Sequence, residues 1–180
     1  MRPNSSTQQF DPSVKGIPMK AMRICSRLTV TGLLVGALLG MSAGRSSRWA
    51  VAQPSFVTLA AGFAPNPTEL AGTGGGDRWA VNVVGITNTS TGPCVGYISE
   101  SPHEEVTLET GFANLEMRVE SDLDTTLVIT GPGGIWCNDD SGSKNPVIAG
   151  AWLPGQYQVW IGAYQAGQVP DYTLYIQDRR

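Results

Sequence analysis

The stretch that decides the fold covers residues 121–175. It begins SDLDTTLVITGPGGIWCNDDSG at Ser121 and closes with LPGQYQVWIGAYQAG (153–167) and DYTLY (171–175). Short runs of alternating apolar and polar residues follow one another there, separated by turns rich in Gly and Pro. Alternation with period two is the pattern of a β-strand that has one buried face and one wet face. The stretch therefore predicts consecutive strands joined by tight turns.

The same alternation extends upstream of this stretch. Over residues 115–120 the apolar side chains take one face and the charged side chains the other, and residues 105–110 repeat the pattern. Residues 79–86 (WAVNVVGI) also predict a strand. No segment after Gln53 shows a sustained helical period. Roughly eight short strands at close spacing predict an all-β fold, an antiparallel β-sandwich.

The first 52 residues predict a cleavable signal peptide with a polar N-terminal extension. Basic residues precede an apolar run of 12 residues, 28–39, which suits a signal-peptide core and is short for a bilayer span. Small residues at 50–52 (AVA) favour cleavage before Gln53. The alternative is a leader that stays uncleaved as a membrane anchor. Two internal methionines are alternative starts of translation, Met19 and Met22.

The remaining chain divides into a leading segment, 53–92, with a flexible Gly-rich loop at 72–76, and a β-sandwich over 93–178. After residue 52 there are five Lys or Arg and fourteen Asp or Glu, a net charge of −9. Such a surface repels phosphate backbones, so nucleic acid is excluded as a partner. Once the leader is cleaved we expect no membrane association and a secreted or periplasmic location.

Two cysteines follow the leader, Cys94 and Cys137. In an oxidising compartment an isolated pair predicts a disulfide bond. A metal site is the alternative, but the sequence has no CxxC motif and no Cys/His cluster. The closed loop would span 43 residues, for which chain entropy predicts about 4 kcal/mol of stabilisation.

Two acidic clusters flank a predicted hairpin at 125–137. Its closure would bring both clusters to the same end of the sheet. Four carboxylates on one rim could hold Ca²⁺, which takes six to eight oxygen ligands. The alternative is that these side chains cap their own turns through hydrogen bonds to the backbone. The candidate ligands are Asp122, Asp124, Asp139 and Asp140.

Catalytic residues are not evident. His103 is the only histidine, in a predicted turn between strands, where we expect it to be exposed. No GxSxG nucleophile motif is present. Glu104 and Glu105 are adjacent on a strand, so they point to opposite faces and form no carboxylate pair. The sequence therefore predicts a protein that is not an enzyme and needs no cofactor other than a possible Ca²⁺.

Aromatic side chains offer a second kind of binding surface. Trp160 and Tyr175 lie on the faces opposite the apolar sets of their strands, which predicts that both are exposed. Exposed aromatic rings can stack on sugar rings or pack against a protein partner. The alternative is that they pack in the core or in cross-strand pairs.

Several motifs together resemble the bacterial pre-peptidase C-terminal (PPC) domain. They are DxDTTL at 122–127, GPGG at 131–134, NDDSG at 138–142 and PGQYxVxIG at 154–162. The resemblance implies a jelly-roll-like β-sandwich of the kind found on secreted proteins. It also implies a non-catalytic module, since some members of the family bind calcium or help attachment to collagen or polysaccharide.

The function expected from the sequence is therefore binding or adhesion. We expect a secreted non-catalytic module that binds an extracellular polymer, a surface or a partner protein. Two alternatives remain open, a small secreted hydrolase and a structural envelope protein held in the membrane by its leader.

Overall fold

The computed structural model describes residues 54–180, so the predicted signal peptide lies outside the described residues. The described chain forms thirteen strands and one short helix. Nine strands have five residues or more, and four have two. In chain order the elements are β1 (Ser55–Leu59), β2 (Thr68–Thr73), β3 (Arg78–Trp79), α1 (Ala80–Val84), β4 (Asn88–Thr89), β5 (Gly92–Pro93), β6 (Tyr97–Ile98), β7 (Glu104–Leu108), β8 (Phe112–Glu120), β9 (Thr125–Gly131), β10 (Gly134–Asn138), β11 (Val147–Trp152), β12 (Gly155–Ala163) and β13 (Asp171–Asp178).

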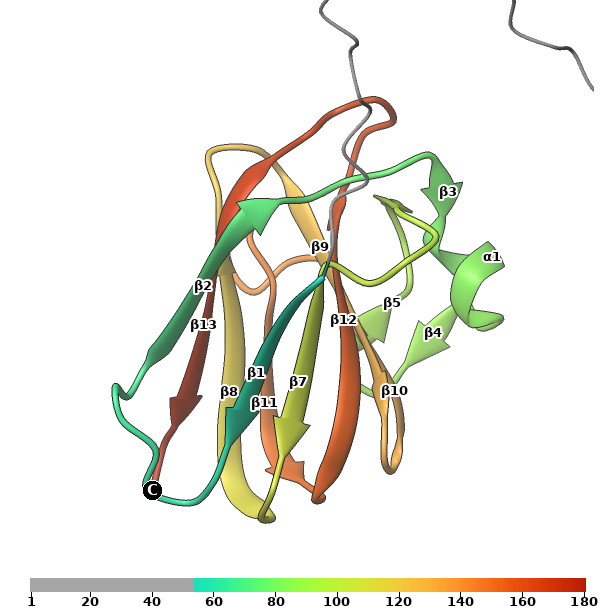
Figure 1. The fold of residues 1–180 in the computed structure, drawn as a ribbon. Helices are drawn as coiled ribbons and strands as arrows, with labels where there is room; N and C mark the ends of the chain where they lie inside the picture. Colours follow the sequence, from blue (N-terminus) through green and yellow to red (C-terminus); the bar gives the residue numbers. More distant parts are fainter. Residues whose placement is uncertain (1–53) are drawn as a thin grey trace, which may run out of the picture. The chain divides into compact units, whose positions relative to one another are not determined.

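Two sheets pack face to face (Figure 1). The seven-stranded sheet has the order β1-β7-β12-β6-β3, with β9 on the other side of β12 and β10 beside β9. The four-stranded sheet has the order β11-β8-β13-β2. All neighbouring strands are antiparallel except β1 and β7, which are parallel. The predicted all-β sandwich is confirmed.

The sandwich begins earlier than predicted. Strand β1 pairs with β7 and strand β2 pairs with β13, so the chain from Ser55 onward contributes to both sheets. The division into a leading segment before residue 93 and a sandwich after it is therefore wrong. The apolar run at 56–59 indicated at most one strand in this segment, because Pro and Gly at the density of residues 62–67 usually mark irregular structure.

The main core lies between the sheets and takes the inward side chains of both. On β8 the buried Leu115, Met117 and Val119 face this core, as the alternation predicted. On β13 the buried residues also alternate, with Leu174 and Ile176 at the centre. Each such side chain contributes about 1.5–3 kcal/mol when it leaves water, so this layer holds the sheets together.

A second, smaller core lies on the outer face of the seven-stranded sheet. The segment that carries α1, β4 and β5 covers this face beside β10 (Figure 1). Its buried members are Ala80, Cys94, Ile98, Val128, Cys137 and Trp160. Strand β9 is consequently buried on both faces, with Val128 in this second core and its neighbours in the main core.

Most of residues 79–86 forms a helix turn rather than the predicted strand, and only Trp79 is in a strand, at the end of β3. Helix α1 covers five of them, Ala80–Val84, and ends at Gly85, whose φ of 77° lies in the left-handed region. Gly is the residue that closes a helix in this conformation at little cost. The apolar run is too short for its period to distinguish a helix from a strand, so the prediction followed its β-branched composition.

Candidate functional site

One end of the sandwich carries the predicted acidic rim. The hairpin formed by β9 and β10 pairs Asn138 with Leu127, so the residues after β10 return to the level at which β9 begins. This closure was predicted from the sequence. It places Asp139 and Asp140 near Asp124, which directly precedes β9.

Three carboxylates converge there, and we call them the acidic rim: Asp124, Asp139 and Asp140. One carboxylate oxygen from each lies within 4.8 Å of the others. The Oδ1 atoms of Asp124 and Asp139 are buried and receive no hydrogen bond from the described residues. Buried acceptors without a donor cost free energy, and a cation is one group that would satisfy them.

The charges of the acidic rim repel one another. Burial, together with repulsion from the neighbouring Asp140 and Asp124, raises the pKa of Asp139 to about 6. The pKa of Asp124 is also raised, first by burial and then by Asp140, while Lys144 opposes the increase. A divalent cation would remove this repulsion, because it favours the ionised form of each carboxyl group.

The loop beside the acidic rim is held by side-chain hydrogen bonds. Asn145 donates from Nδ2 to the carbonyl of Ser121 at 3.0 Å and accepts from the hydroxyl of Thr125 at 2.9 Å. Lys144 donates from Nζ to the carbonyl of Asp122. Asn138 uses Oδ1 to accept from the hydroxyl of Ser141 and from the Val147 amide. The turn chemistry anticipated as the alternative is therefore present, carried mainly by Asn and Ser.

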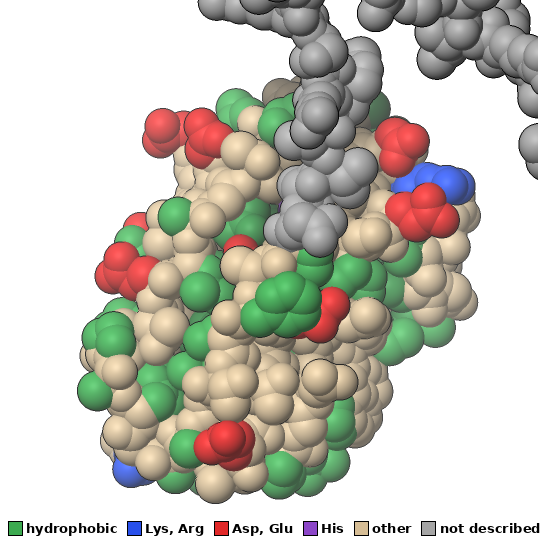
Figure 2. Space-filling model, in the orientation of Figure 1, with side chains coloured by type: hydrophobic (Ala, Val, Ile, Leu, Met, Phe, Trp, Pro, Cys, Tyr) green, Lys and Arg blue, Asp and Glu red, His purple; other side chains and the backbone are tan. Residues whose placement is uncertain are grey.

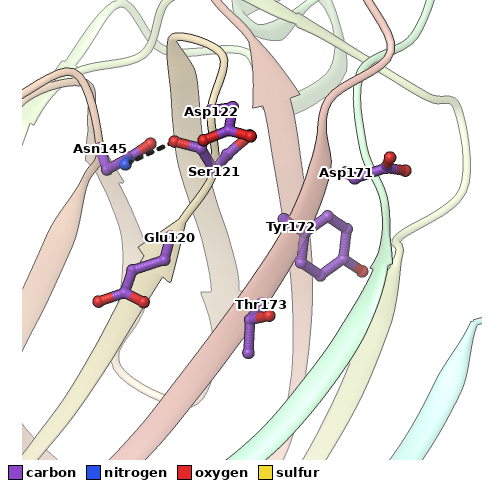
Figure 3. A pocket seen from close by; sticks show the side chains of 7 residues that line it. All are labelled: Glu120, Ser121, Asp122, Asn145, Asp171, Tyr172 and Thr173. Carbon is purple, nitrogen blue, oxygen red and sulfur yellow. Dashed lines mark hydrogen bonds between the residues drawn. The ribbon is translucent and has the colours of Figure 1, made fainter.

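Asp122 does not belong to the group of three. It lines a separate hollow of about 540 Å³ between the β8–β9 connection and the start of β13 (Figure 3). Glu120 and Asp122 stand on one side of this hollow and Asp171 on the other. The prediction that four aspartates share one site is thus wrong for Asp122, which lines this separate hollow instead.

Acidic side chains are spread over the face shown in Figure 2, while basic ones are few. Grouping of acids alone is therefore weak support for a metal. Asp178 also has buried oxygens without a hydrogen bond, but Arg180 forms an ion pair with it. The acidic rim differs because two such oxygens lie where three carboxylates converge.

The cysteine prediction is confirmed, since Cys94 and Cys137 form a disulfide with a Cα–Cα distance of 5.0 Å. The bond joins the segment after β5 to β10. Both cysteines are fully buried in the second core. The disulfide thus fastens the covering segment to the strand that leads into the acidic rim.

The two aromatic candidates have different outcomes. Trp160 is only 4% exposed, so the prediction of an exposed ring is wrong. It does point to the outer face of its sheet, but the segment carrying α1 covers that face. Tyr175 is half-buried on the outer face of the other sheet, where the guanidinium of Arg118 lies 4.4 Å from its ring centroid. Its ring is thus partly occupied by a cation–π contact.

His103 is half-buried rather than exposed as predicted. Its Nδ1 accepts a hydrogen bond from the Ile161 amide at 3.2 Å, and its Nε2 lies 3.4 Å from the hydroxyl oxygen of Ser99. Burial lowers its pKa to about 4, against a smaller opposing effect of a hydrogen bond to the Gly75 backbone. The neutral ring therefore carries its proton on Nε2, so it cannot take a proton from Ser99.

Sequence reasoning missed Glu104 as a site residue. It is 1% exposed and accepts a hydrogen bond from the hydroxyl of Tyr172 at 2.6 Å and another from Ser55. Burial raises its pKa, while these two hydrogen bonds oppose the increase. A signal was available, because Glu104 shares the strand face of Val106 and Leu108, and a charged residue on an apolar face is unusual.

No family model matches the chain. An uncharacterized protein of Synechococcus elongatus is 34% identical over 88 residues, which cover 47% of this chain and 65% of that protein. The chain thus spans just under two thirds of the length of the curated relative that it matches. Membership of the PPC family is therefore not shown by these comparisons.

Two solved structures are similar in outline. One is the pre-peptidase C-terminal domain of a collagenase from Bacillus anthracis, with a TM-score of 0.39, 10% identity and coverage of 69% of this chain and 97% of that one. The other is PliG of Aeromonas hydrophila, a periplasmic inhibitor of g-type lysozyme, with a TM-score of 0.39, 15% identity and coverage of 69% and 98%. Scores this low support no inference about function.

Among residues 54–180, no helix has the length and apolar character needed to cross a bilayer.

Proposed function

We propose that this chain is a secreted or periplasmic, non-catalytic β-sandwich module that binds an extracellular polymer, surface or partner protein with the help of Ca²⁺. The observation that carries the proposal is the acidic rim, where three carboxylates meet and two buried oxygens lack donors. Ca²⁺ prefers carboxylate oxygens, and its charge would offset the repulsion among them. Asp124, Asp139 and Asp140 would be its ligands.

Two features support binding rather than catalysis. The only histidine uses both ring nitrogens in contacts that leave no base for a nucleophile. The acidic rim lies on turns at the end of a rigid sandwich fastened by a disulfide. Loops on a rigid scaffold are the usual place for binding residues. The hydrolase alternative would need His103, and the anchored alternative depends on residues outside 54–180.

The test is capture by polymers in the presence and absence of calcium. The exported protein is incubated with insoluble polysaccharides and with collagen, in millimolar Ca²⁺ or in EDTA. We expect retention on at least one polymer that falls in EDTA and in the Asp139→Asn/Asp140→Asn variant, because both remove the cation. Asp122→Asn is the matched control, since Asp122 lies outside the acidic rim, and it should be retained like the wild type.

Two outcomes would contradict the proposal. A folded Asp139→Asn/Asp140→Asn variant that is retained like the wild type, with no difference between Ca²⁺ and EDTA, would remove calcium from it. Release of soluble fragments from a polymer, abolished by His103→Ala, would establish the hydrolase instead.

A further inference from the structure

A cleft of about 650 Å³ opens between the two sheets, away from the acidic rim residues. Its walls come from β1, from the glycine run at 72–76, from residues 99–104 and from the start of β13. Clefts of this volume accommodate small ligands. The walls carry several hydroxyl groups, those of Thr73, Ser99 and Ser101 among them.

Glu104 lines this cleft and is only 1% exposed. The hydroxyls of Ser55 and Tyr172 donate to its two oxygens, one from β1 and one from the opposite sheet. Gly72 makes room for this arrangement, because a Cβ there would lie 2.7 Å from the Tyr172 hydroxyl oxygen. Both oxygens are thus oriented by donors, which offset part of the effect by which burial raises the pKa of Glu104.

No cation of the described chain neutralises that charge. His103, next in sequence, is neutral near pH 7 because burial lowers its pKa to about 4. The five Lys and Arg side chains of residues 54–180 all contact other groups. Arg78 pairs with Asp77 and Glu100, Arg118 with Glu120, Arg179 with Glu116, Arg180 with Asp178, and Lys144 with the Asp122 carbonyl. A buried carboxylate without a cation is costly, so a cationic ligand would be strongly complementary.

We propose that this cleft binds a small hydroxylated ligand that carries a primary ammonium group, an amino sugar in its simplest form, with Glu104 as the counter-ion. The inference deepens the proposed function, on which it rests, by giving the binding module a ligand class and a second site. The ammonium lies against the Glu104 carboxylate. The ligand hydroxyls meet the hydroxyl-bearing walls.

The chemistry of the cleft favours an ammonium over other cations. A metal ion would need several oxygen ligands, whereas Glu104 is the one buried carboxylate lining the cleft, with Glu100 exposed at its edge. A guanidinium prefers both oxygens of a carboxylate in one plane, and here each oxygen already accepts a hydroxyl. An ammonium needs a single acceptor direction per proton, which a carboxylate and neighbouring hydroxyls supply.

The test compares D-glucosamine with D-glucose and N-acetyl-D-glucosamine by NMR titration of the exported protein, with the glucosamine trimer as the polymer-like arm. We expect saturable binding of glucosamine and binding at least about tenfold weaker for both neutral sugars, as charge pairing of a buried group implies. The shifted amides should be those of residues 72–76 and 99–104. Tighter binding of the trimer would identify a polysaccharide as the source of the amino sugar. Equal binding per sugar unit would identify the free monosaccharide instead.

Matched variants separate the inference from simpler explanations. Glu104→Gln removes the charge and should weaken glucosamine binding by about tenfold or more, whereas Glu105→Gln, one residue along and on the other face, should leave it within about twofold. Asp122→Asn, outside both sites, should also leave it unchanged, which excludes nonspecific attraction to surface carboxylates. Equal binding of glucose and glucosamine, or shifts confined to the acidic rim, would overturn the inference even if Glu104→Gln fails to fold. Retention on polymers without glucosamine binding would leave the proposed function standing and reject this inference alone.

Discussion

At the acidic rim, Asp139 is the residue whose ionisation is most perturbed. Burial, with repulsion from Asp140 and Asp124, raises its pKa from 3.8 to about 6. The folded state therefore binds this proton more tightly than the unfolded state does. The resulting stabilisation is complete below about pH 3.8 and is lost as the pH rises through about 6. His103 acts in the opposite direction over an overlapping range, because burial lowers its pKa to about 4.

A variant isolates the contribution of Asp139 from that of His103. In EDTA at pH 7, Asp139→Asn should melt at a higher temperature than the wild type, because it removes a penalised charge. The difference should shrink as the pH falls through about 6, where the wild-type carboxyl takes up its proton. Thermal denaturation from pH 4.5 to pH 8 measures this. Adding Ca²⁺ at pH 7 should reverse the order of the two proteins, because only the wild type keeps its full set of ligands.

A melting difference that does not vary with pH would contradict this account of Asp139. Asp122→Asn controls for the loss of one negative charge near the same end of the sandwich, and its effect should be smaller.

The alternation of single residues predicted side-chain direction well and exposure poorly. Trp160 points to the outer face as predicted, yet a segment distant in sequence covers that face. Glu104 shares the core face with Val106, and only the hydroxyls of Ser55 and Tyr172 make that position tolerable. The face to which a side chain points is set locally by its position along the strand. Its burial and its hydrogen-bond partners depend on contacts between segments that are distant in sequence. The acidic rim was predictable because one hairpin creates it.

At the scale of elements, the glycine run at 72–76 shows why composition gave a wrong prediction of flexibility. It was predicted to be a flexible loop, but Gly74 and Gly75 are buried. Their amides donate to the Pro170 and Ile161 carbonyls at 2.8 Å each. The run crosses closely over neighbouring backbone, which only a residue without a side chain permits. Composition alone cannot distinguish a glycine needed for flexibility from one needed for close approach.

Gly76→Ala should therefore be strongly destabilising. A Cβ at Gly76 would lie 2.1 Å from the Ile98 carbonyl carbon and 2.2 Å from the Ser99 amide nitrogen, so the backbone of β6 must move. We expect a loss of about 2–4 kcal/mol in the free energy of unfolding, the range of severe overpacking. Urea denaturation measures it. Gly111→Ala is the control, because its nearest neighbour would be the Trp152 carbonyl oxygen at 3.5 Å. Similar stabilities for the two variants would mean that the run is flexible after all.

At the scale of the whole molecule, the disulfide links the second core to the acidic rim. The covering segment also binds β10 through hydroxyls, since Thr91 donates to the Cys137 carbonyl at 2.8 Å and accepts from its amide at 3.2 Å. Asn138 in turn donates from Nδ2 to the Thr91 carbonyl at 2.9 Å. The strand end that leads to Asp139 is thus held from outside the sandwich. Loosening the covering segment should loosen the rim as well.

Replacing both cysteines by alanine tests this link. The disulfide closes a separation of 43 residues, so its loss should cost about 4 kcal/mol of unfolding free energy. The main core lies on the other side of the seven-stranded sheet and should keep the sandwich folded, with native far-UV circular dichroism at low temperature. Calcium should then stabilise the variant less than it stabilises the wild type, because ordering the rim would consume part of the binding free energy. An equal calcium response in both proteins would show that the β9–β10 hairpin orders the acidic rim without the covering segment.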